Sequence, residues 1–204
     1  VFKSGKLEES VEVPESWLDV PFFKYPEFLE LIEKGEGRPD TKEVFKLFFG
    51  ISEDMANSNF KIEMLHSMNN QLEFLKAEPF TKELATHFKF KGKSFRIPNE
   101  IGEMTLGKYR DIVESGAEVL SGRTSSLIET IKTYPEMIAV FVAPKGYTPT
   151  DLEDLAKEIN VLPVPEIIGL GNFFMRQYVN LRNGTLKNSL LRSKTTNKNK
   201  PDFQ

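Results

Sequence analysis

An internal repeat constrains what this chain can fold into more than any other feature of its sequence. Residues 97–114 align with residues 13–30 without a gap, and several like side chains meet in this register. The matched polar, aromatic and proline pairs are Pro14 with Pro98, Asp19 with Glu103, Lys24 with Lys108, Tyr25 with Tyr109, Glu27 with Asp111 and Glu30 with Glu114. The repeat predicts two pseudo-repeated helical halves that open with the same proline-to-tyrosine segment.

Outside residues 86–97 the apolar residues recur mostly at helical spacing. In residues 60–75 an apolar side chain returns every three to four positions, which predicts an amphipathic helix. Residues 136–142 are apolar nearly all round, and such a run is compatible with a helix or with a buried strand. Capping residues, prolines and glycines predict the other helices: Pro21 or Lys24 to Glu33, a helix from Asp40 or Thr41 to Gly50, Leu106 to Glu114 behind Thr105, a short helix ending at Thr133, Thr150 to Ile159, and Pro163 or Pro165 to Leu181.

Between Thr86 and Ile97 the apolar period changes from helical to alternating. Two short alternating runs flank Lys91-Gly92, which predicts a β-hairpin. A lone hairpin is marginal in water, so it must pack on helices or pair with the N-terminal segment. The predicted fold class is therefore mainly α with a small β-hairpin (α+β).

These patterns divide the chain into five segments. We predict an extended N-terminal arm or edge strand, a first helical half, a hairpin linker, a second helical half and a basic flexible tail. Their bounds are 1–12, 13–85, 86–97, 98–183 and 184–204.

Composition narrows the class of protein. The chain has 204 residues, of which 39% are hydrophobic and 17 are Phe, enough for a core in one compact domain or two small lobes. It has no Cys, which excludes disulfides and thiolate metal sites. No apolar run approaches the length of a membrane span, and the N-terminal sequence lacks a signal-peptide core. We therefore expect cytosolic synthesis and no membrane association.

No catalytic, cofactor or metal site is predicted. The two histidines, His66 and His87, have no partner ligand at zinc spacing, and no serine or cysteine nucleophile motif is present. The glycine pairs at residues 35–37 and 169–171 lack the context of a phosphate-binding loop. For the second pair, inside an apolar helix, we expect close helix packing.

Two segments are candidates for partner binding. The first is the aromatic patch at residues 17–28, where Trp17, Phe22 and Phe23 are interpreted as docking residues because aromatic side chains dominate interface hot spots. The second is the C-terminal tail, with six Lys or Arg against one acid from residue 182 onward. A solubilising tail, an arm that contacts phosphates and an arm that enters an acidic partner surface all fit this composition. The tail cations singled out for binding are Arg192, Lys194, Lys198 and Lys200.

The segment Glu103-Met104-Thr105-Leu106-Gly107-Lys108-Tyr109 resembles the helix-opening signature of small helical proteins of Bacteroidetes tailed phages, including crAss-like phages. Those proteins often carry the signature twice, with an aromatic segment between the copies; residues 44–51 stand in that place here. A late helix ending in a Phe pair, here Phe173-Phe174, is also typical. The resemblance covers roughly residues 13–180, and the first copy differs by having Pro21 and Phe23 where Thr and Gly would stand.

The resemblance implies a non-enzymatic virion component, either structural or packaged cargo. Its partners would be portal, tail or capsid proteins, and it would be present in multiple copies, synthesised in the host cytoplasm and carried in the virion. A transient tail-assembly chaperone that is absent from the mature particle is the nearest alternative. A nucleic-acid-binding protein that acts through the basic tail is a further one.

Overall fold

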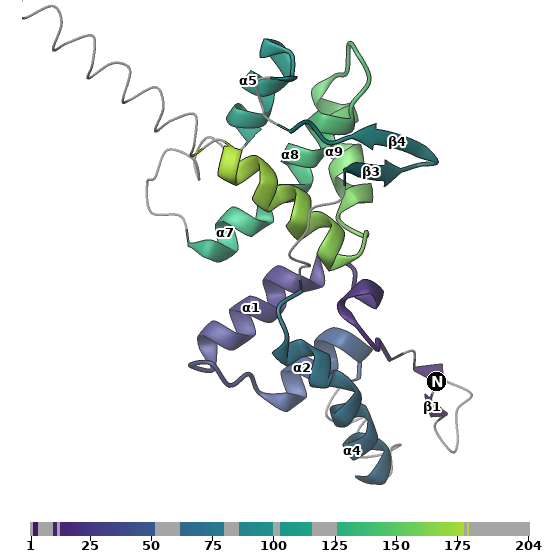
Figure 1. Cartoon of the computed structure of the whole chain (residues 1–204). Helices are drawn as coiled ribbons and strands as arrows, with labels where there is room; N and C mark the ends of the chain where they lie inside the picture. The colour runs from purple at the N-terminus through teal and green to yellow at the C-terminus, as the bar shows by residue number, and fades with distance from the viewer. Residues whose placement is uncertain are drawn as a thin grey trace, which may run out of the picture.

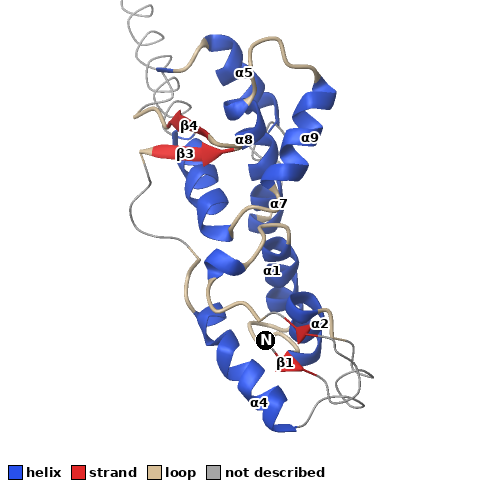
Figure 2. Ribbon diagram, turned by 90° about the vertical axis from the view of Figure 1, so that its right-hand side faces the viewer, coloured by secondary structure: helices blue, strands red, loops and turns tan. Residues whose placement is uncertain are grey.

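The computed structural model of this chain is mainly helical with a small antiparallel hairpin, as the sequence predicts. It describes residues 2–3, 10–11, 13–51, 62–79, 86–99, 103–115, 126–177 and 179. Figures 1 and 2 show an elongated arrangement, with α1, α2 and α4 at one end and α5, α8, α9 and the hairpin at the other.

The first half opens with a short 3₁₀ helix, η1 (Trp17–Asp19), followed by α1 (Lys24–Lys34). Ser16 caps η1 through a capping box, in which its hydroxyl accepts from the Asp19 N–H and the Asp19 carboxylate accepts from the Ser16 N–H. Helix α1 ends at Lys34, one residue beyond the predicted end at Glu33, and Gly35 is its C-cap.

Two further helices complete the first half. Helix α2 (Thr41–Phe49) begins behind Asp40, whose carboxylate accepts from the Lys42 N–H, and ends at Gly50, which adopts the left-handed conformation with φ of 66°. Helix α4 (Ile62–Gln71) then continues into the 3₁₀ helix η2 (Leu72–Lys76). The helix predicted over residues 60–75 is therefore α-helical up to Gln71 and a 3₁₀ helix beyond it. Ser52 followed by Glu53 and Asp54 also predicts the start of a short helical turn, but these residues lie outside the described residues.

The hairpin has the predicted position and turn. Strand β3 (His87–Phe90) pairs antiparallel with β4 (Lys93–Arg96), and Lys91 and Gly92 have φ of 49° and 71°. Two successive positive φ values give the turn whose twist suits adjacent antiparallel strands. Near the N-terminus, β1 (Phe2–Lys3) pairs with β2 (Ser10–Val11) in a separate sheet.

The second half consists of helices around a buried one. These are α5 (Leu106–Ser115), α7 (Leu127–Lys132), α8 (Tyr134–Val142), α9 (Pro149–Ile159) and a last described helix over residues 164–177, yellow-green in Figure 1. In α8 every residue except Glu136 is buried, which resolves the helix-or-strand alternative in favour of a helix.

Thr105 precedes α5 as predicted, and its hydroxyl accepts from the Lys108 N–H at 3.4 Å. Ser126 caps α7 in a capping box with Glu129. The prediction of a cap at Thr150 is wrong, because the cap is Thr148, whose hydroxyl accepts from the Asp151 N–H. Pro149 accounts for the difference: proline is favoured at the first helical position, where its missing N–H would have no partner.

A short backbone pairing joins the two halves. Residues 20–23 hydrogen-bond to residues 160–164, and the Phe22 N–H donates to the Leu162 carbonyl at 2.8 Å. Pro21 and Pro163 form an isolated antiparallel bridge at the centre of this pairing. We call these two segments the junction.

The last described helix contacts α8 without room for a side chain at Gly171. A Cβ there would lie 2.0 Å from Cδ2 of the Tyr134 ring. The ring is 2% exposed, and its hydroxyl donates to Asn172 Oδ1 at 2.7 Å. The close helix packing expected of the glycine pair at residues 169–171 is therefore found at its second glycine.

We predict that Gly171→Ala destabilises the protein. The new methyl group collides with the buried Tyr134 ring, and overpacking of this kind costs about 1–3 kcal/mol. Urea unfolding of both proteins measures the difference. Gly107→Ala is the matched control, because it lies in α5 with open space around its Cβ, and it should leave the free energy of unfolding unchanged or raise it by about 0.5–1 kcal/mol. Equal effects of the two changes would contradict this packing.

Candidate functional site

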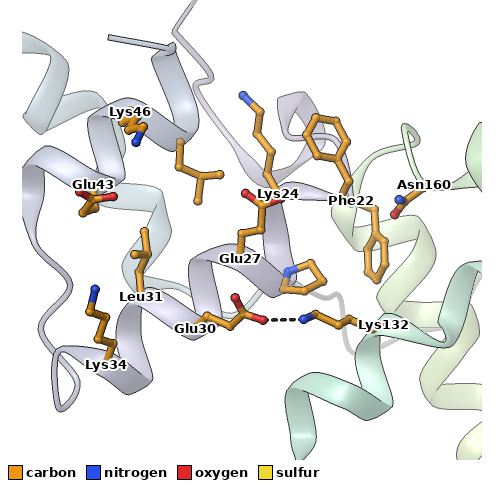
Figure 3. A pocket seen from close by; sticks show the side chains of 13 residues that line it. Phe22, Lys24, Glu27, Glu30, Leu31, Lys34, Glu43, Lys46, Lys132 and Asn160 are labelled. Atoms are coloured by element: carbon orange, nitrogen blue, oxygen red, sulfur yellow. Dashed lines mark hydrogen bonds and ion pairs between the residues drawn. The ribbon is translucent and has the colours of Figure 1, made fainter. Parts of the chain in front are cut away.

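The candidate site is a groove of about 980 Å³ beside α1. Helices α1 and α2 supply most of its walls, and Lys132 of α7 and Asn160 close it from the second half (Figure 3). Its charged lining residues are Lys24, Lys34, Lys46, Lys132, Glu27, Glu30 and Glu43. The groove is thus built by both halves and has an excess of one cation over the acids.

Apolar side chains lie between these charges. They come from Phe22, Phe23, Pro26, Leu31 and Leu47. Phe22 is 1% exposed and belongs to the core, whereas Phe23 is 39% exposed. A half-exposed aromatic ring with charged neighbours is the arrangement found at protein interfaces, which have apolar centres and polar rims.

The groove lysines differ in their partners. Lys132 forms an ion pair with Glu30 across α7 and α1, marked by the dashed line in Figure 3. Lys24 donates to the Phe48 carbonyl at 3.2 Å. Within the described part of the chain, the side chains of Lys34 and Lys46 make no ion pair or hydrogen bond. Those two ammonium groups remain available to an anionic group that enters the groove.

Lys24 has a counterpart in the second half. The repeat alignment equates it with Lys108, whose ammonium donates to the carbonyls of Phe141 at 2.9 Å and Ala143 at 3.1 Å. Each lysine therefore lies at the C-terminal end of a neighbouring helix, α2 or α8, where carbonyl groups favour a cation. Burial lowers the pKa of both lysines, and for Lys24 the Glu27 carboxylate opposes that effect.

A second polar cluster lies between α5 and the loop before α9. The Tyr147 hydroxyl donates to the Asp111 carboxylate, and Arg110 lies 3.4 Å from the same carboxyl group. Burial, together with the hydrogen bond to Asp111, raises the pKa of Tyr147 to about 12. A phenol with this pKa stays protonated at neutral pH, so the cluster serves as a hydrogen-bonded link between the two elements.

Of the three aromatic residues predicted to dock a partner, two are buried and one is at the surface. Trp17 is 6% exposed, packs edge-on against Tyr25 and Phe74, and donates from Nε1 to the Ala77 carbonyl at 2.9 Å. Trp17 and Phe22 are therefore core residues, because the junction and η2 cover them, and we do not propose partner binding for them. Phe23 stays at the surface.

The tail cations Arg192, Lys194, Lys198 and Lys200 lie outside the described residues. In the described residues, no group of three or more His, Asp or Glu side chains is arranged to hold a metal ion. None of the described helices has the length and apolar character of a membrane span.

Sequence reasoning did not identify the groove. The repeat alignment did single out Lys24, since Lys108 stands at the same position, and that match was the available signal. Lys34, Lys46 and Lys132 give no such signal, because they come together only when α1 packs against α2 and α7.

Comparison with known protein families, curated proteins and solved structures finds no match to this chain.

We predict that Lys108→Met destabilises the protein by about 1–2 kcal/mol, because two carbonyl groups at the end of α8 lose a charged donor. Lys24→Met should cost less, since Lys24 reaches one carbonyl at 3.2 Å. Chemical denaturation measures both. Lys145→Met, at an exposed position, is the control and should change stability by less than about 0.5 kcal/mol. A Lys108→Met protein as stable as the control would show that desolvation of the ammonium cancels the gain from these bonds.

We also predict that stability falls as the pH rises from about 10 to 12. Burial is the main cause that raises the pKa of Tyr134 to about 12, and the pKa of Tyr147 is also raised to about 12. Both folded-state values exceed the unfolded value of about 10. The stabilisation by these protonated phenols is thus fully present below pH ~10 and is lost as the pH passes about 12.

Denaturation at a series of alkaline pH values measures this loss, and tyrosinate absorbance reports the pKa values. Tyr147→Phe should make the loss of stability less steep and remove one phenol that ionises near pH 12. An unchanged slope in this variant would contradict the assignment.

Proposed function

We propose that this chain is a non-enzymatic component of a bacteriophage particle, either structural or packaged cargo, that binds other virion proteins. Its expected partners are portal, tail or capsid proteins. The observation that carries the proposal is the groove with its half-exposed Phe23 and its two cations that lack a partner in the described residues. The resemblance of residues 103–109 to phage proteins supplies the biological setting.

The backbone around Phe23 is held in place before any partner arrives. The Phe23 N–H donates to the Asn160 carbonyl at 2.9 Å, so the junction fixes the start of α1. Val161, the next residue along the chain from Asn160, is 59% exposed. Two large apolar side chains thus stand at the surface on neighbouring, fixed segments, which reduces the entropy lost on binding.

The chemistry of the groove favours one kind of occupant. An apolar side chain of the partner suits Phe23 and Leu47, and carboxylates of the partner suit Lys34 and Lys46. The proposed ligand is therefore an acidic, partly apolar segment of another virion protein. Truncating an aromatic residue at the centre of such an interface commonly weakens binding by about tenfold or more.

A transient tail-assembly chaperone would use the same groove and leave before the particle is complete. Mass spectrometry of purified particles separates the two functions, because a virion component is retained and a chaperone is not. The proposal places the chain first in the host cytoplasm and then in the particle.

We predict that Phe23→Ser weakens binding to the virion partner by about tenfold or more. The tagged chain is co-expressed with the portal, tail and capsid proteins encoded near its gene, and the retained partner is quantified after affinity purification. Leu106→Ser is the matched control, because Leu106 is 81% exposed and does not line the groove.

Equal retention by the Phe23 and Leu106 variants would remove the groove from the interface. If the unmodified chain retained none of these proteins and were also absent from particles, the proposed function would be wrong.

A further inference from the structure

The β3–β4 hairpin concentrates positive charge. Residues 86–97 contain Lys89, Lys91, Lys93 and Arg96 and no acidic residue, whereas the whole chain has a net charge of −3. This segment lies at the opposite end of the molecule from α4 and apart from the groove (Figures 1 and 2).

The strand register sorts the hairpin side chains by face. His87 is paired with Arg96 and Lys89 with Ser94, so these four side chains share one face. Their burial identifies it as the outer face, since all four are exposed while Phe88 on the other face is 5% exposed. The outer face therefore presents charge and hydrogen-bond donors.

Three of the four cations are uncompensated. Lys91 forms an ion pair with Glu158 of α9 at 2.6 Å. The side chains of Lys89, Lys93 and Arg96 make no ion pair or hydrogen bond with any residue that the structure describes. They form what we call the hairpin triad: Lys89 and Arg96 lie on the outer face, and Lys93, the partner of Phe90, is exposed on the other face beside the turn.

The hairpin holds the triad on a fixed support. Phe90 is 6% exposed and stacks with its neighbour Phe88 at 6.2 Å between ring centroids. The Phe95 ring lies beside the Phe141 ring of α8, with 6.2 Å between the ring centroids. With its inner face packed on the helices and its turn fixed by Lys91 and Gly92, the hairpin presents its cations in a preorganised array.

We propose that the exposed cations of the β3–β4 hairpin, Lys89 and Arg96 on the outer face and Lys93 beside the turn, bind the phosphate backbone of nucleic acid. Lysine and arginine contacts to phosphates supply most of the sequence-independent affinity for DNA. A two-stranded β-ribbon also has the dimensions that the DNA major groove admits. An acidic protein is a poorer match, because protein interfaces depend on aromatic and apolar centres, and the hairpin aromatics face the core.

The end of the last described helix lies near the base of the hairpin. The Gln177 side chain donates to the Asn99 carbonyl at 3.2 Å, three residues after Arg96 in the sequence. The sequence that follows this helix contains the six Lys and Arg of the tail. The hairpin site is independent of the tail and of the proposed protein partner.

The test measures binding of the full chain to a short fluorescent DNA duplex by anisotropy between about 50 and 200 mM NaCl. The hairpin variant is Lys89→Gln, Lys93→Gln and Arg96→Gln. The control variant is Lys76→Gln, Lys145→Gln and Arg38→Gln. It also removes two lysines and one arginine, but from exposed positions outside the hairpin. Thermal melting verifies that both variants are folded.

We predict that the hairpin variant binds at least about tenfold more weakly than the control variant at the lower salt concentration. The slope of log K against log salt should also become shallower by about 3, one unit for each lost phosphate contact. Equal weakening in both variants, or no binding by the unmodified chain, would overturn the proposal. Equally tight binding of polyglutamate, also lost in the hairpin variant, would overturn it in favour of an acidic protein.

Discussion

The structure depends on the backbone pairing at the junction. Residues 20–23 are followed at once by α1, and residues 160–163 separate α9 from the last described helix, so this pairing ties together the starts of two helices from different halves. It buries Phe22 completely and places Lys132 within reach of Glu30. Because a buried backbone group without a partner is costly, the register of these hydrogen bonds also fixes which side of α1 faces outward.

In each half, a lysine at the same position of the repeat donates to carbonyl groups at the end of a neighbouring helix. Lys24 and Lys108 each start from the first turn of a helix and end at the last carbonyl groups of another. A long, flexible side chain with a partly desolvated ammonium can satisfy carbonyls that the helix itself leaves open. The aligned side chains Phe28 and Ile112 are both buried, so the helix after each lysine faces the core in the same register.

Local signals in the sequence were enough to predict most of the fold. The bounds of α1, α2 and α5 follow from caps, glycines and apolar spacing, and the hairpin follows from alternation around Lys91-Gly92. The form of α8 was not predictable, because a run that is apolar on all sides has no period. The burial of Trp17 and the formation of the groove were also not predictable, since both depend on segments distant in the sequence.

The groove has walls from both sides of the junction, and this has a thermodynamic consequence. Any segment that contacts Phe23 and Leu31 from one half together with Lys132 and Asn160 from the other is bound only while the halves remain docked. Occupancy and docking are therefore linked, and a partner present at a hundred times its dissociation constant would add about 2.7 kcal/mol to the stability of the docked arrangement. An interaction that fills the groove would therefore also add to the stability of the pairing that holds the two halves together.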